Sequence, residues 1–174
     1  MLNERSEERK RLRLPAYSYT AGCYFVTICT KDRQCFLAEI QPTVGADDSV
    51  RPYDASAPYT YHLTPMGAII RDCMERLDSA DEGVSVEKYV IMPNHVHALI
   101  HIEGDGGGQS RPPLQRVIQR FKSITTRRCW EMGVKAIWQR SFYDHVIRNE
   151  RDYLRAWQYI EDNPAQWAED EYFA

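Results

Sequence analysis

The chain has 174 residues, of which 43% are hydrophobic and 11% aromatic, and this fits one globular domain with its own core. The net charge of −3 excludes a uniformly basic nucleic-acid-binding protein, and no apolar run approaches the roughly 18 residues that span a bilayer, so we expect a cytoplasmic protein. Five scattered cysteines without a Cys-x-x-Cys pair favour neither a disulfide framework nor a zinc ribbon.

Charge is distributed unevenly along the chain. Residues 1–15 are charged, with several arginines, and we expect them to form a basic flexible arm ahead of a single domain over 16–174. Residues 111–128 carry basic side chains and no acidic one, whereas the last fourteen residues carry acidic side chains and no Lys or Arg. The basic block indicates phosphate contacts, made by Arg111, Arg116, Arg120, Lys122, Arg127 and Arg128.

The first half of the domain predicts two strands, a long loop and a helix. Residues 23–30 are rich in β-branched and aromatic side chains and predict the first strand, and a second strand is expected near 35–40. The Pro-, Gly- and Asp-rich residues from about 41 to 58 predict a surface loop inserted into the domain. Thr64 and the proline after it predict the start of a helix over about 65–79.

The second half predicts three more strands and two helices. The strands are expected over 84–92, 95–102 and 136–147, and the basic helix over 112–132. A final helix is expected to begin after Asn149 and to stop at Asn163-Pro164. This order of elements predicts an α+β fold, with helices packed mainly on one face of a largely antiparallel sheet.

Two histidines stand two residues apart in the strand predicted over 95–102. Side chains alternate along a strand, so His95 and His97 point to one face while Val96 and Ala98 point to the other. The apolar face is expected to meet the core, which leaves two imidazoles able to converge on one ion or one phosphate. Taken alone, the pair also fits two half-exposed histidines that are hydrogen-bonded to neighbours.

The final helix offers a second set of reactive groups. Tyr159 and Asn163 are four residues apart and therefore lie on one helical face. A phenol can attack phosphorus once a metal polarises the phosphate, and an amide oxygen four residues later can reach that metal. Ordinary packing is the alternative role for this tyrosine, and Tyr143 and Tyr153 remain rival nucleophiles.

Several motifs together resemble one enzyme family. Pro93-Asn-His-Val-His97 resembles the His-hydrophobic-His signature of single-tyrosine transposases. The segment from Trp138 to Tyr153, together with Tyr159-Ile-Glu-Asp-Asn-Pro164, resembles their REP-associated branch, and Gly22-Cys-Tyr-Phe-Val-Thr-Ile adds a further match near the start. The resemblance covers about residues 16–164 and is to the insertion-sequence-two-hundred-like transposases.

The resemblance implies a fold, a reaction and a set of site residues. The implied fold is a ferredoxin-like or RNA-recognition-like antiparallel sheet. By resemblance, His95 and His97 are metal ligands, Asn163 is the third protein ligand, and Tyr159 is the nucleophile that forms a 5′-phosphotyrosine link. The implied cofactor is a divalent ion, Mg or Mn, and the implied partner is single-stranded DNA with a hairpin-forming palindrome. A homodimer is compatible with the family.

Two other functions stay open on the sequence. A non-catalytic single-stranded nucleic-acid-binding module would need aromatic side chains on the sheet face where the histidines are expected. A metal-dependent nuclease would use His95 and His97 with an activated water instead of a tyrosine. Only a covalent adduct with DNA separates that nuclease from the tyrosine mechanism.

Overall fold

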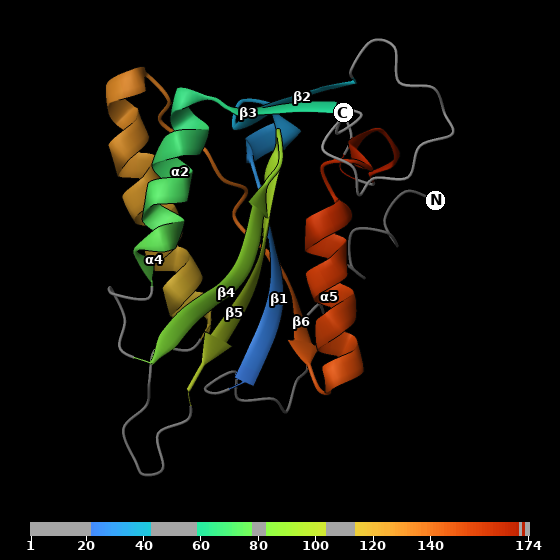
Figure 1. Ribbon diagram of the computed structural model, residues 1–174. Helices are drawn as coiled ribbons and strands as arrows, with labels where there is room; N and C mark the ends of the chain where they lie inside the picture. The colour runs from blue at the N-terminus through green and yellow to red at the C-terminus, as the bar shows by residue number, and fades with distance from the viewer. Residues whose placement is uncertain (1–21, 43–58, 78–82, 104–113, 171, 173–174) are drawn as a thin grey trace, which may run out of the picture.

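The structure, a computed structural model, describes residues 22–42, 59–77, 83–103, 114–170 and 172 (Figure 1). The predicted basic arm, most of the predicted loop insertion and Arg111 lie outside the described residues. The main sheet has four antiparallel strands in the order β4-β5-β1-β6. Their bounds are Gly22–Cys29 for β1, Val84–Ile91 for β4, His95–Ile102 for β5 and Tyr143–Ile147 for β6.

The connections define a ferredoxin-like topology, as predicted. Helix α2 (Pro65–Glu75) joins β1 to β4, and helix α4 (Leu114–Cys129) joins β5 to β6. The first and third strands of this set therefore occupy the centre of the sheet and the second and fourth its edges. Crossover connections of this kind place both helices on the same face.

The three helices divide between the two faces of the sheet. In Figure 1, α2 and α4 lie together on one face, while α5 (Glu150–Asp162) runs along the other. The prediction that helices pack mainly on one face holds for α2 and α4. The final helix packs on the opposite face, against β4 and β5. That face carries the apolar side chains of Phe25 and Leu99 beside the histidines, and α5 shields them from water.

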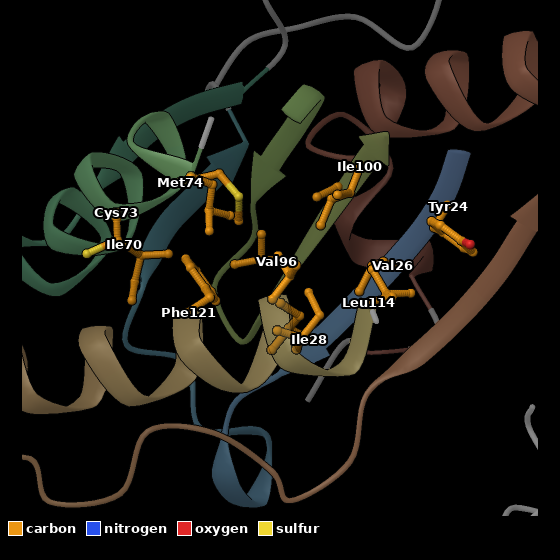
Figure 2. Packing of buried hydrophobic residues seen from close by; sticks show 14 of the residues in the cluster. Tyr24, Val26, Ile28, Ile70, Cys73, Met74, Val96, Ile100, Leu114 and Phe121 are labelled. Atoms are coloured by element: carbon orange, nitrogen blue, oxygen red, sulfur yellow. The ribbon is translucent and has the colours of Figure 1, made fainter. Parts of the chain in front are cut away.

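The hydrophobic core lies between the sheet and the pair α2 and α4 (Figure 2). Alternate residues of β1 and β5 point into it, as the period of two requires. The strands contribute Tyr24, Val26, Ile28, Val96, Ala98 and Ile100. The helices contribute Ile70, Cys73, Met74, Leu114, Val117, Ile118 and Phe121. These side chains are nearly or fully buried, so the core face of the sheet is an apolar interior.

A small second sheet pairs β2 (Ala38–Pro42) with β3 (Tyr59–Leu63). The strand expected near 35–40 starts later and includes the first two residues of the predicted loop insertion. Strand β3 was not predicted, although its Tyr-Thr-Tyr-His-Leu sequence has β propensity. Its five residues form a strand because β2 supplies the partner.

Helices α2 and α5 begin at the cap residues that the sequence predicted, Thr64 and Asn149. The side chain of Thr64 accepts from the amide of Gly67 at the start of α2, and the side chain of Asn149 accepts from the amide of Asp152 at the start of α5. Helix α2 ends four residues earlier than predicted, at Glu75.

The region after α4 departs from its prediction. A 3-10 turn, η3 (Trp130–Met132), follows the helix, and Gly133 closes it with a positive φ of 82°. Only residues 143–147 of the strand predicted over 136–147 join the sheet; before them the structure records one bridge, from Trp138 to Thr30. Within the described residues, every helix is too short or too polar to span a bilayer.

Candidate active site

The two histidines lie at the start of β5, on the face of the sheet away from α2 and α4. His95 is fully buried and His97 is 1% exposed. The side chains of His97 and Phe25 stack with ring centroids 5.2 Å apart. The predicted strand alternation is therefore confirmed. The alternative of two half-exposed histidines does not hold, because α5 and residues after it cover this face.

Each imidazole is held through its Nδ1 atom by a neighbouring side chain. His95 Nδ1 lies 2.8 Å from Asn94 Oδ1, and His97 Nδ1 lies 2.9 Å from Thr27 Oγ1 on β1. The Asn94 amide is oriented because its Nδ2 donates to the carbonyls of Arg33 and Tyr172. Its Oδ1 can only accept, so His95 carries its proton on Nδ1.

The other nitrogens of the pair face each other, with Nε2 to Nε2 at 2.9 Å. Burial lowers the pKa of His95 to about 2, helped by the charges of His97 and Arg33, and Asn163 opposes the change. Burial also lowers the pKa of His97 to about 3. Both rings are neutral at pH 7, so His97 Nε2 donates to His95 Nε2 while Thr27 donates to His97 Nδ1.

This arrangement can present two lone pairs to a cation after one proton shift. If the His97 proton moves to Nδ1, Thr27 Oγ1 accepts it in a hydrogen bond, because a hydroxyl can donate or accept. Both Nε2 atoms are then bare and only a few ångströms apart. A hydrogen-bonded Nδ1–H on each ligand histidine is the usual support of a metal site.

Two oxygen donors lie beside the imidazoles. Asn163, the C-cap residue of α5, is 2% exposed, and its buried Oδ1 accepts no hydrogen bond within the described part of the chain. A carboxylate oxygen of Asp170 lies 3.9 Å from His95 Nε2, and its side chain is 2% exposed. His95, His97 and Asp170 offer ligand atoms that all lie within 4.8 Å of one another. An unsatisfied buried amide oxygen, two imidazoles and a carboxylate fit a divalent cation.

Asp170 was not identified from the sequence, where it counted only as part of an acidic tail. The 3-10 turn η4 (Trp167–Glu169) brings it back over the histidines, and the ring of Trp167 lies 6.0 Å from that of His95. The amide of Tyr172 donates to Asp170 Oδ1 at 2.6 Å. Asp170 follows α5, which ends before Pro164, and it lies about 75 positions after His95. No periodic pattern in the sequence relates residues this far apart, so the contact is visible only in the structure.

Tyr159 opens onto a cleft of about 860 Å³ whose wall includes His97, Phe25 and Thr27. Tyr159 is 39% exposed, and its ring makes an edge contact with that of His97, with ring centroids 5.1 Å apart. The helical spacing predicted that Tyr159 and Asn163 share a face, and the structure places both beside the histidine pair. The cleft therefore combines an accessible phenol with a buried pair of neutral nitrogen donors.

The rival tyrosines differ in position. Tyr143 on β6 lines the same cleft and is 39% exposed. Tyr153 does not line it: its ring packs on Trp157, and burial, with a hydrogen bond to Glu87, raises the pKa of Tyr153 to about 12. Tyr172, which the sequence did not suggest, lines the cleft with its ring 4.7 Å from that of His95.

The predicted DNA-binding residues spread over more than one side of α4. Arg116, Arg120 and Arg127 are exposed and share one helical stripe. Arg128 turns toward α2, where it donates to Cys73 Sγ and lies 3.8 Å from a carboxylate oxygen of Asp72. Arg111 lies outside the described residues.

Lys122 points in another direction, toward the residues ahead of β6. Its ammonium donates to the carbonyls of Gln139 and Ser141, both at 2.8 Å. Burial lowers the pKa of Lys122 to about 8. In the same segment Trp138 donates to Thr125 Oγ1 and packs on Phe121. These contacts anchor one wall of the tyrosine cleft to α4.

Comparison with solved structures identifies the fold. The structure is similar to that of a REP-associated tyrosine transposase bound to a REP hairpin, with a TM-score of 0.60, 22% identity, and coverage of 89% of this chain and 73% of that chain. At this identity the likeness shows the fold alone. It agrees with the ferredoxin-like arrangement of the strands.

Sequence comparison identifies the family. The family described as Transposase IS200 like matches residues 66–163, more than half of the chain. The protein therefore belongs to the IS200-like transposase family and is a DNA cleavage and strand-transfer enzyme by membership. The matched range includes both histidines, Tyr159 and Asn163.

Two relatives are similar to this chain. The REP-associated tyrosine transposase of Escherichia coli (strain K12) is 33% identical over 87 residues, which cover 49% of this chain and 47% of that relative. The chain thus aligns with about half the length of that protein. An uncharacterized protein of Haemophilus influenzae is 28% identical over 183 residues and aligns along 95% of this chain and 93% of its own length.

Proposed function

We propose that this protein cleaves and rejoins single-stranded DNA through a 5′-phosphotyrosine intermediate on Tyr159. The observation that carries the proposal is the contact between the exposed Tyr159 ring and His97 at the edge of a cleft large enough for a nucleotide. A phenol beside two buried neutral imidazoles is a suitable nucleophile next to a cation site.

A divalent ion, Mg or Mn, would be held by His95, His97 and Asn163, with Asp170 as a fourth donor. Such an ion would supply charge neutralisation at a phosphate oxygen. The orphaned Oδ1 of Asn163 and the buried carboxylate of Asp170 support this donor set. Oxygen donors of this kind favour Mg or Mn over the softer metals that two imidazoles alone would accept.

The reaction follows from what the tyrosine can do. The Tyr159 oxygen attacks the scissile phosphorus and loses its proton, the new O–P bond forms, and the bond to the 3′ oxygen breaks and leaves a 3′-hydroxyl. Because the phosphotyrosine keeps a phosphodiester, the same or another 3′-hydroxyl can attack it and rejoin strands. Phe25, stacked on His97 and in edge contact with Tyr159, keeps the phenol close to the pair.

The proposed substrate is a hairpin-forming palindrome of the REP type. The solved structure that shares this fold holds a REP hairpin, and the E. coli relative has the corresponding name. We propose that the exposed Arg116, Arg120 and Arg127 of α4 contact phosphates. Arg111, Lys122 and Arg128 complete the set proposed from the sequence, although in this structure Lys122 donates to two backbone carbonyls and Arg128 turns toward α2. The catalytic unit is proposed to be one domain.

The test is covalent trapping with a labelled hairpin DNA in Mn²⁺ and in Mg²⁺. Wild-type protein should give an adduct that survives denaturing electrophoresis, and Tyr159→Phe should give none. Tyr143→Phe and Tyr172→Phe are matched controls from the same cleft and should keep the adduct. An adduct that persists in Tyr159→Phe would reject this nucleophile, whereas strand cleavage without any adduct would indicate a nuclease that uses activated water.

A further inference from the structure

A second hollow lies next to the tyrosine cleft, on the other side of the segment before β6. It has a volume of about 450 Å³ and lies between the second half of α4 and residues 135–140. Gln139 lines both hollows, so they adjoin at this residue. We call this second hollow the basic groove.

The wall between the two hollows is fixed in place. The Lys122 ammonium, which reaches from α4, donates to the carbonyls on either side of Arg140. On the same segment Trp138 is anchored to Thr125, and Ile137 is fully buried. The groove is therefore a preformed feature of the fold, and its charged side chains are presented from a rigid base.

The lining of the basic groove carries positive charge and no carboxylate. Arg127, Lys135 and Arg140 are exposed. Among the described residues no ion pair joins any of these three to an acidic side chain. Three cations without a counter-charge in one groove suit a chain of phosphates.

An exposed tryptophan stands in the same groove. Trp130, the first residue of η3, is 58% exposed, the largest value among the exposed large hydrophobic side chains of the described residues. A flat aromatic ring at the edge of a cationic groove is the arrangement that stacks unpaired bases while cations follow the backbone. Trp138 cannot serve in this way because its indole is fixed against Phe121.

We propose that the basic groove binds an unpaired flank of the DNA strand whose scissile phosphate occupies the tyrosine cleft. A base of this flank stacks on Trp130, and its phosphates contact Arg127, Lys135 and Arg140. The inference rests on the proposed function, because it needs a single strand in the neighbouring cleft. It adds Trp130, Lys135 and Arg140 to the DNA-contacting residues and assigns the groove to single-stranded DNA, not to the hairpin stem.

The test compares two labelled DNAs by fluorescence anisotropy: a hairpin with a single-stranded flank and the same hairpin with no flank. Trp130→Ala should weaken binding of the flanked hairpin at least about fivefold and leave binding of the bare hairpin unchanged. Trp130→Phe should restore most of the affinity, because a phenyl ring still stacks. Lys135→Ala and Arg140→Ala should each weaken binding of the flanked hairpin. Each should also reduce the slope of log K against the logarithm of the salt concentration by about one.

Arg71→Ala is the matched control, since this arginine is exposed on α2 outside the groove. It should leave both affinities unchanged. The inference would be overturned if Trp130→Ala lowered the affinity for both DNAs equally, or lowered neither affinity. Covalent trapping tests the proposed function separately. If wild-type protein forms no adduct, the tyrosine reaction is rejected. If it forms the adduct but Trp130→Ala has no effect specific to the flanked hairpin, only the role of the basic groove is rejected.

Discussion

The two faces of the main sheet are built from the same strands, yet they differ in kind. One face presents Val26, Ile28 and Val96 to α2 and α4 and is an apolar core. On the other face, Thr27 and His97 point toward α5, alternating in sequence with those core residues. The first face buries apolar groups, which gain by leaving water, whereas the second buries polar groups among them.

The comparison shows how the fold keeps the histidine pair out of bulk water while Tyr159 stays accessible in the cleft. Polar groups on the α5 face are removed from solvent and must satisfy one another, as the links between His95, His97 and Thr27 do. Burial keeps the imidazoles neutral, which is the form that ligates a metal. The apolar face supplies the rigidity and the polar face supplies the chemistry.

The largest expected effect comes from removing an imidazole from the polar face. His97→Ala should lower DNA cleavage in saturating Mn²⁺ by about 10³-fold or more, because one donor and the ring beside Tyr159 are lost together. Isothermal titration with Mn²⁺ should show loss of the binding event. Circular dichroism should show that the variant is folded.

The control for that variant comes from the apolar face. Phe121→Ala removes a side chain that is 1% exposed and should lower the free energy of unfolding by about 3–5 kcal/mol. Cleavage per folded molecule should stay close to wild type. The contrast fails if Phe121→Ala loses activity as completely as His97→Ala at a temperature where both are folded.

The elements behind the apolar face could be predicted from sequence. The period of two in 95–102 turns Val96 and Ala98 toward the core, and Thr64 marks the start of α2. Strand β3 and the shortened β6 could not be predicted, because five-residue strands depend on a partner more than on their own propensity.

The polar face could be predicted only in part. Strand alternation and helix spacing each pair two residues, which is why the His95 and His97 pair and the Tyr159 and Asn163 pair were found. Contact between the two pairs depended on α5 crossing to the second face, and the family resemblance suggested it. Asp170 belongs to neither periodic pattern, so its approach to His95 is a product of the tertiary fold.

An intermediate effect is expected on stability as pH falls. In the unfolded chain a histidine has a pKa near 6.5, whereas burial lowers the pKa of His95 to about 2 and that of His97 to about 3. Below pH 6.5 the unfolded chain therefore binds protons that the folded protein excludes, and stability falls by roughly 1 kcal/mol per pH unit for each histidine. The full contribution is present above pH 6.5.

Urea unfolding between pH 7 and pH 5, in EDTA, measures this slope. Asp152, whose pKa is lowered from 3.8 by its bond to His145, titrates below this window. A variant that carries both His95→Asn and His97→Asn should lose most of the pH dependence. If the free energy of unfolding of that variant depended on pH as in wild type, other groups would control acid unfolding. The buried histidines would then not make the polar face more sensitive to acid than the apolar face.

The smallest expected effect separates two buried threonines, one on each side of the sheet. Thr27→Val removes the hydroxyl beside His97 Nδ1, so the ring loses the acceptor for its Nδ1–H in the tautomer that turns a bare Nε2 to a cation. We expect Mn²⁺ affinity to fall about tenfold, and Thr27→Ser to restore it because serine keeps the hydroxyl. Thr125→Val removes a hydroxyl that donates to Phe121 and accepts from Trp138, and it should reduce stability without reducing the intrinsic affinity for Mn²⁺. Equal Mn²⁺ affinities in the two valine variants would mean that the support of His97 contributes nothing to the cation site.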